Sequence, residues 1–170
     1  MLTRNAYVLL AAVVLLFVLS FFIPLLFSIT RLFLFVLVFL VCTDAVVLYS
    51  KRAGIKGSRI TPERFSNGDD NSIHLNIENH YTFTTDIKII DELPFAFQQR
   101  SWKRKAVLKG GQECRISYTL RPLQRGEYAF GNINVFVTSP LALVQRRYIF
   151  EQPQTIPAYP SFLHLKQYQL

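Results

Sequence analysis

The sequence predicts a transmembrane α-helical hairpin followed by an all-β, immunoglobulin-like antiparallel sandwich. Two observations predict this fold class: residues 6–49 are almost all apolar, and the rest of the chain contains short runs in which apolar and polar residues alternate. Cys42 and Cys114 fall in different parts of this pattern, so no disulfide is expected and a reducing compartment fits. The expected domains are residues 1–50, residues 51–159 and a remainder, residues 160–170.

Two apolar runs, residues 6–27 and 32–49, predict two membrane-spanning helices. At about 1.5 Å per residue they extend roughly 33 and 27 Å, close to the bilayer core of about 30 Å. Residues 28–31 join the runs, which predicts an antiparallel pair in which Ser28 or Thr30 caps the second helix. A cleaved signal peptide does not fit, because the first run is too long and a second one follows.

Cations that flank the helices predict their orientation. Arg4 precedes the first helix and only Arg31 lies between the two, whereas several cations follow the second: Lys51, Arg52, Lys56 and Arg59. Because the cytoplasmic flanks of membrane helices are enriched in Lys and Arg, both ends of the hairpin and the β-domain are expected in the cytoplasm.

Asp44 is the acidic residue of the second apolar run. An acid inside a membrane span can mark an ion path or a contact with a partner. Asp44 lies about 7–8 Å inside the predicted helix end, however, by the rise of the helix. The favoured interpretation is therefore that its carboxylate reaches interfacial water or pairs with Lys51 or Arg52.

Alternation with a period of two predicts the strands of the second domain. About seven or eight short strands, each buried on one side, are typical of an antiparallel sandwich. Turn-forming residues separate them at 66–69, 79–80, 110–111 and 139–140. The expected strands are residues 60–65, 73–78, 85–90, 105–108, 114–121, 132–138, 143–150 and 154–158.

Gly126, Glu127 and Tyr128 predict a tyrosine corner, in which the tyrosine hydroxyl bonds to backbone a few residues upstream. Gly126 is expected to adopt a positive φ, which a side chain would penalise. Arg125 would then lie at one end of the sandwich.

We expect the Arg125 guanidinium to gather backbone carbonyls or to pair with Asp91 or Glu92. The alternative is an anion site formed by Arg121 and Arg125. The structural role is favoured, because a phosphate site normally adds a helix N-terminus or a glycine-rich loop.

The chain also resembles the domain-of-unknown-function 58 family of bacterial membrane proteins, in their N-terminal part only. The matching residues are Asp44, Asn-Ile-Glu-Asn at 76–79, Asp-Glu-Leu-Pro at 91–94, Tyr-Thr-Leu-Arg-Pro at 118–122, Arg-Gly-Glu-Tyr at 125–128, Gly131, Thr-Ser-Pro-Leu at 138–141 and Tyr-Pro at 159–160. Family members usually carry glycine where this chain has Ala142. The resemblance implies structural roles for Gly131 and Pro140, and a bacterial cytoplasmic (inner) membrane protein often encoded beside MoxR-type AAA+ ATPases and von Willebrand A-like proteins.

A basic segment around one tryptophan is a candidate contact for an anionic ligand. Arg100, Trp102, Lys103, Arg104 and Lys105 could meet lipid headgroups or nucleic acid. The favoured interpretation is a solvated hairpin loop, with Trp102 folded onto the sandwich edge, since basic clusters are common on proteins that bind neither. If a ligand is bound, membrane lipid is the expected partner and nucleic acid is not, because the hairpin keeps the domain near the bilayer.

Motifs for catalysis were not found. The sequence has no phosphate loop, dinucleotide fingerprint or metal-ligand spacing, and its histidines are scattered at positions 74, 80 and 164. We therefore expect no catalytic residue, cofactor or metal, and a non-enzymatic, membrane-anchored interaction module. The alternative function is an anionic-ligand binding module that uses residues 100–105.

Residues 160–170 are expected to begin a missing C-terminal domain. Ser161 can cap a helix, and the apolar residues that follow have nearly helical spacing. Members of the resembled family continue into a von Willebrand A-like region at this point. The sequence therefore predicts that the chain is a fragment.

Overall fold

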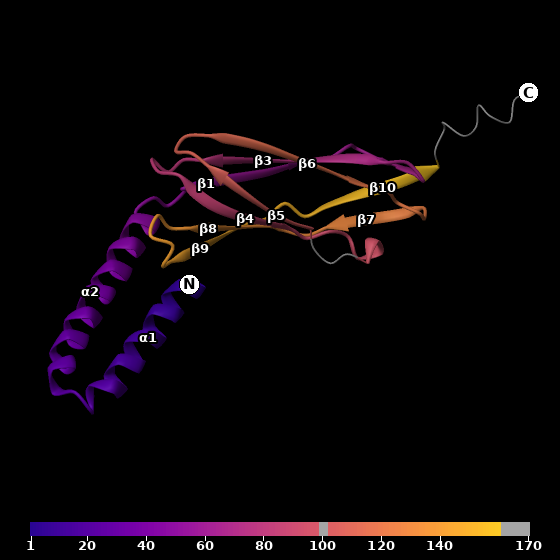
Figure 1. Ribbon diagram of the computed structural model, residues 1–170. Coiled ribbons are helices and arrows are strands. Elements are labelled where there is room, and N and C mark those ends of the chain that lie inside the picture. The colour runs from indigo at the N-terminus through magenta and orange to yellow at the C-terminus, as the bar shows by residue number, and fades with distance from the viewer. Residues whose placement is uncertain (99–101, 161–170) are drawn as a thin grey trace, which may run out of the picture.

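The computed structural model describes residues 1–98 and 102–160, so Arg100 and residues 161–170 of the predicted start of a further domain lie outside the described residues. Two antiparallel helices come first, α1 (Arg4–Ser20) and α2 (Pro24–Tyr49). α2 is long and apolar enough to cross a bilayer, whereas α1 has 17 residues and is the shorter apolar helix. Figure 1 shows the pair projecting from one end of a layered β-domain.

The turn of the hairpin lies at residues 21–23, earlier than the predicted turn at residues 28–31. Pro24 explains the difference. Proline has no N–H group and would interrupt a helix that ran on to residue 27, but it is well placed at the first position of a new helix. Thr30 therefore lies inside α2, where its hydroxyl donates to the Leu26 carbonyl (2.9 Å), and the predicted cap of the second helix is wrong. Thr3 instead caps α1.

The β-domain follows after a short link, residues 50–54. It contains a single 3-10 turn, η1 (Phe95–Phe97), among its described residues. Its strands are β1 (Ile55–Ile60), β2 (Phe65–Asn67), β3 (Asn71–Asn79), β4 (Thr85–Asp91), β5 (Trp102–Leu108), β6 (Glu113–Leu120), β7 (Gly126–Phe130), β8 (Ile133–Thr138), β9 (Gln145–Phe150) and β10 (Gln154–Pro160).

These strands form an immunoglobulin-like sandwich, as predicted. One layer has the order β1-β3-β6 and the other β5-β4-β8-β9, and a short sheet, β2-β10-β7, lies at the end away from the helices (Figure 1). All neighbouring strands are antiparallel except β2 and β10, which are parallel.

The core lies between the layers and confirms the predicted alternation. The residues that fill it are fully or almost fully buried and come from alternate positions of β3, β4 and β8: Ile73, Leu75, Ile77, Ile87, Ile89, Ile133, Val135 and Val137. Ala6 of α1 and Leu48 of α2 belong to the same buried cluster. The hairpin and the sandwich therefore share one core.

One predicted strand, residues 60–65, is wrong. β1 ends at Ile60 and β2 begins at Phe65, and the chain bends between them. Pro62 accounts for the break, because it offers no N–H group to a neighbouring strand. Phe65 is nevertheless fully buried, since it opens the next strand on the inner face.

Candidate functional site

Asp44 joins α2 to the sandwich. Its side chain is only 3% exposed and accepts hydrogen bonds from the backbone N–H groups of Leu141, Leu143 and Val144, each at 3.2 Å. The Ser139 hydroxyl also donates to this carboxylate. Hydrogen bonds to a charged group are stronger than those between neutral groups. Asp44 thus organises the loop between β8 and β9 from the side of α2.

The interpretation that Asp44 reaches water or pairs with Lys51 or Arg52 is therefore wrong. The Lys51 ammonium instead donates to the His80 carbonyl at 2.8 Å, and the Arg52 carbonyl accepts from Arg146. A signal for the burial was present in the sequence. The buried residues of α2 recur at helical spacing along one stripe: Thr30, Leu37, Asp44 and Leu48.

The first residues of the chain bind the same loop. The Thr3 N–H donates to the Leu143 carbonyl (3.0 Å), and the Gln145 N–H donates to the Met1 carbonyl (2.7 Å). Leu2 pairs with Val144 as an isolated antiparallel bridge. Residues 139–145 therefore hold the start of α1 and the end of α2 at one place, which we call the hairpin seat.

Ala142 has an unusual backbone conformation within the hairpin seat. Its φ is 55°, in the left-handed region, and its N–H closes a turn onto the Ser139 carbonyl (2.9 Å). Pro140 is exposed at the second position of this turn, where its fixed φ is favoured. The turn thus forms although alanine occupies a position that suits glycine.

We expect Ala142→Gly to raise the free energy of unfolding by about 0.5–1 kcal/mol. The left-handed conformation costs an alanine about 1–2 kcal/mol, and the larger entropy of an unfolded glycine offsets part of the gain. Ala129→Gly, in the exposed middle of β7, is the control, and its free energy of unfolding should fall by a similar amount. Denaturation of the protein in nanodiscs measures both, and equal losses in the two variants would contradict the prediction.

Arg146 closes the C-terminal end of α2. Its guanidinium donates to the carbonyls of Leu48 (3.2 Å), Lys51 (2.7 Å) and Arg52 (3.2 Å). It also lies between two aromatic rings, 4.8 Å from the centre of Tyr49 and 4.6 Å from that of Tyr148. A cation is stabilising where helix carbonyls have no further partner. Sequence reasoning missed this residue, because an arginine in a strand carries no local signal of the distant carbonyls that it binds.

Tyr81 adds a second buried contact at this end of α2. Its hydroxyl donates to the Leu48 carbonyl (2.7 Å) and lies 2.6 Å from the Tyr148 hydroxyl. Burial, followed by the bond to Tyr148, raises the pKa of the Tyr81 hydroxyl above its usual value. The Tyr81 hydroxyl therefore stays protonated while it donates to the Leu48 carbonyl.

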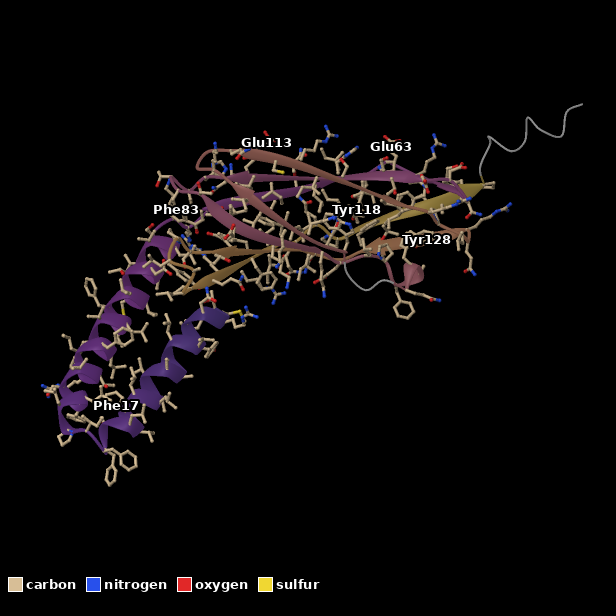
Figure 2. The ribbon with its side chains drawn as sticks, viewed as in Figure 1. Phe17, Glu63, Phe83, Glu113, Tyr118 and Tyr128 are labelled. Atoms are coloured by element: carbon tan, nitrogen blue, oxygen red, sulfur yellow. The ribbon has the colours of Figure 1, made fainter. Side chains whose placement is uncertain are left out.

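A buried ion pair lies inside the sandwich. Arg59 and Asp91 have side chains that are 0% exposed, and the guanidinium binds the carboxylate through two nitrogens. The same guanidinium donates to the carbonyls of Gln152 and Gly131, each at 3.0 Å. The Tyr118 hydroxyl donates to Asp91 at 2.5 Å, and Tyr118 projects between the layers (Figure 2). Burial, together with the Asp91 carboxylate, raises the pKa of Tyr118.

The role that was predicted for Arg125 thus belongs to Arg59. Arg125 is exposed and makes no hydrogen bond with another described residue; Arg121 is also exposed. Arg59 was interpreted only as a cation that flanks the predicted membrane helix. It faces inward because β1 pairs with β3 and places alternate side chains against the core.

The tyrosine corner is confirmed. The Tyr128 hydroxyl donates to the Gln124 carbonyl at 2.8 Å, and Gly126 has a φ of 146°. Gly131 also has a structural role, because a Cβ there would lie 2.4 Å from a Glu92 carboxylate oxygen. Its N–H donates to the Glu92 carbonyl at 3.0 Å.

We expect Tyr128→Phe to lower the free energy of unfolding by about 1–2 kcal/mol, through the loss of one buried hydrogen bond. Tyr159 is half-exposed in β10 and supplies the control. Tyr159→Phe should change stability by less than about 0.5 kcal/mol. Equal stability of Tyr128→Phe and the parent would show that the corner bond does not contribute.

The residues of the basic segment do not act together. Trp102 stacks on Tyr118, with ring centres 4.6 Å apart, and the Arg104 guanidinium lies 5.7 Å from the Trp102 ring. The segment begins strand β5 rather than forming a loop, so Lys103 and Lys105 point to the opposite side from Trp102. Of the described residues of the segment, only these two lysines lie on the open face of the sheet.

Histidines and acids do not gather into a metal site in the described part of the chain. His74 lies 2.7 Å from the Ser117 hydroxyl, and His80 lies 3.1 Å from the Glu78 carboxylate. Both contacts are on the surface. His164 lies outside the described residues.

The sequence matches no model of a known protein family and no curated protein. Among solved structures, it is similar to PapD-like domain 7 of human CEP192, with a TM-score of 0.45 and 14% identity over 63% of this chain and 84% of that one. The CARDB domain of the PF1109 protein from Pyrococcus furiosus gives a TM-score of 0.41 and 12% identity over 62% and 87%. At these values, neither similarity bears on the function of this chain.

Proposed function

We propose that this chain is a non-enzymatic, membrane-anchored interaction module. Its hairpin spans the bacterial cytoplasmic membrane and presents the sandwich to a partner in one orientation. The hairpin seat is the observation that carries the proposal. Both helices bind the same loop, through Thr3 and through Asp44, and Asp44 is buried there. A sandwich held in this way cannot swing as it would on a flexible tether.

The dimensions of the hairpin support the membrane span. α2 rises about 30 Å between Pro24 and Asp44, at about 1.5 Å per residue, which equals the thickness of a bilayer core. The tip of the hairpin carries exposed aromatic rings, Phe21 at 85% and Phe22 at 75%. Arg31 lies roughly 10 Å from Pro24 along the helix, close enough to extend its charge toward the far surface.

A cytoplasmic location of the sandwich is supported by the distribution of cations. Arg4, Lys51 and Arg52 are exposed at the end of the hairpin that meets the sandwich, whereas Arg31 is nearer the tip. This asymmetry is the one expected when the sandwich end faces the cytoplasm.

Cysteine labelling in intact bacteria tests this topology. Phe22→Cys at the tip and Glu63→Cys on the sandwich are compared in a background in which Cys42 and Cys114 are replaced. A membrane-impermeant maleimide should label position 22 in intact cells and position 63 only after lysis. Labelling of position 63 in intact cells would overturn the proposed orientation.

The proposed partners are a MoxR-type AAA+ ATPase or a von Willebrand A-like protein, and they follow from the family resemblance. β10 ends at the end of the sandwich away from the hairpin (Figure 1). A partner, or a following domain, would therefore meet the sandwich away from the bilayer.

Affinity purification from native membranes tests the partnership. An AAA+ ATPase or von Willebrand A-like protein should be recovered with the parent chain, and less of it with Asp44→Asn, in which the hairpin seat is weakened. Recovery of neither protein class, with the chain present in the membrane fraction, would contradict the proposed partners.

A further inference from the structure

We infer that the outer face of the β5-β4-β8-β9 sheet is a binding surface for anionic phospholipid headgroups. This inference rests on the proposed membrane anchorage and adds a second contact with the same bilayer. The residues of the surface, which we call the basic face, are Lys88, Lys103, Lys105, Phe136 and Arg147.

Strand register places the basic face on one side of the sheet. Lys88 lies opposite Lys105 on β5 and opposite Phe136 on β8, and Phe136 lies opposite Arg147 on β9. One row across four strands therefore carries three cations and one aromatic ring, and Lys103 lies in the next row. The alternate residues of β4 and β8 point the other way and fill the core.

The cations of the basic face have no carboxylate partner among the described residues. Lys88 and Lys105 lie directly opposite each other, an arrangement of like charges that is unfavourable unless an anion compensates it. Asn134 accepts from the Arg147 guanidinium at 3.0 and 2.7 Å and holds it 5.7 Å from the Phe136 ring. Asp86 is the one acid on this side of β4, in the row nearer the hairpin.

The sheet is hollowed at these lysines. A depression of about 580 Å³ over β4 and β5 is lined by Lys88 and Lys105 but also by Asp86. A second depression of about 400 Å³ is lined only by the cations Lys88, Lys103, Arg104 and Lys105. The two depressions share Lys88 and Lys105. An anionic group seated in the second depression, whose lining holds no acid, would contact more than one ammonium group at once.

The hairpin directs the basic face toward the bilayer. β9 begins at Gln145, whose N–H binds the Met1 carbonyl at the start of α1. Arg147 is two residues further along β9, so its row lies only about 7 Å beyond the hairpin seat. Figure 1 shows β8 and β9 in the layer on the side of the chain's N-terminus, with β1, β3 and β6 in the opposite layer.

Anionic lipid is favoured over nucleic acid by this position. Attraction of a cation to an anionic bilayer falls off within about one Debye length, roughly 8–10 Å at physiological salt, and Arg147 is only about 7 Å along β9 from the hairpin seat, where the proposed membrane span ends. A ring that single-stranded bases could stack on is also missing from the open part of the described face: Trp102 already stacks on Tyr118, and Arg147 covers Phe136.

The test measures the reactivity of each lysine in the full-length protein in nanodiscs. Acetylation rates of Lys88, Lys103 and Lys105 are read by peptide mass spectrometry in phosphatidylcholine discs with and without 30% phosphatidylglycerol. We expect anionic discs to slow these lysines at least fivefold. Lys56, exposed on β1 in the opposite layer, is the internal control and should change less than twofold.

A charge-removal variant gives a second measurement. Binding of monomeric short-chain phosphatidylglycerol to the detergent-solubilised full chain should weaken roughly 100-fold in Lys88→Gln/Lys103→Gln/Lys105→Gln, about fivefold for each charge. The matched control removes three exposed cations elsewhere, in Lys56→Gln/Lys109→Gln/Arg115→Gln. Equal weakening in both variants, or no protection of Lys88 and Lys105 in anionic discs, would overturn the inference.

Two further arms identify the source of any binding. If inorganic phosphate alone, or a single-stranded oligonucleotide without lipid, protects the same lysines, the ligand of the basic face is that anion and not a lipid surface. Either result would overturn the inference. Failure of the membrane anchorage itself would look different, because the chain would then not enter nanodiscs.

Discussion

Asp44→Asn should lower the free energy of unfolding by about 3 kcal/mol. The asparagine keeps one oxygen that can accept, but its amide nitrogen is a donor and would face at least one of the backbone N–H groups that now donate to the carboxylate. Removing a hydrogen-bonded charge from a buried site leaves the former partners without acceptors, which costs about 1–3 kcal/mol for each group that stays unpaired. Trp102, the single tryptophan, stacks on Tyr118 and reports denaturation by its fluorescence in nanodiscs.

Hydrogen exchange locates the effect of the same variant. The amides of Leu143 and Val144 should exchange faster in Asp44→Asn, whereas the amides of β3 should change only by the global loss of stability. Thr43→Val, at the neighbouring residue of α2, should leave both groups of amides unchanged. If Lys51→Met instead reproduces the effect of Asp44→Asn, the carboxylate pairs with Lys51 and not with the hairpin seat.

Arg59→Met should destabilise the sandwich by about 3–5 kcal/mol. It leaves Asp91 buried without its cation, and breaking a buried ion pair on one side costs about this much. The carbonyls of Gln152 and Gly131 lose their donors in the same variant. Chemical denaturation that is followed by Trp102 fluorescence measures the loss.

Two variants separate this prediction from general damage to the core. Arg59→Met/Asp91→Leu removes both charges, and it should recover part of the stability, because no unpaired charge stays buried. The carbonyls of Gln152 and Gly131 and the Tyr118 hydroxyl still lack their partners, so the recovery is incomplete. Arg125→Met changes an exposed side chain and should cost less than about 0.5 kcal/mol. A larger loss for Arg125→Met than for Arg59→Met would restore the role that the sequence predicted for Arg125.

The sequence by itself determined the features that depend on local pattern. The apolar helices and most strands were predictable, because hydrophobic residues recur with the period of the element that buries them. The tyrosine corner was predictable for the same reason, since Gly126, Tyr128 and the accepting Gln124 carbonyl lie within five residues of one another. The position of the hairpin turn could also have been predicted from local sequence, because Pro24 marks the start of α2.

Only the tertiary structure decided which buried charges meet. Asp44 and Ser139 are 95 residues apart in sequence, and Arg59 and Asp91 are 32 apart. A single charged residue in an apolar or alternating run is compatible with a solvent-facing position and with a buried one. The choice depends on whether a partner arrives at the same depth, because an unpaired charge is too costly to bury. The packing of strands and helices that are distant in sequence brings that partner into contact. Local sequence pattern does not show which distant elements pack together.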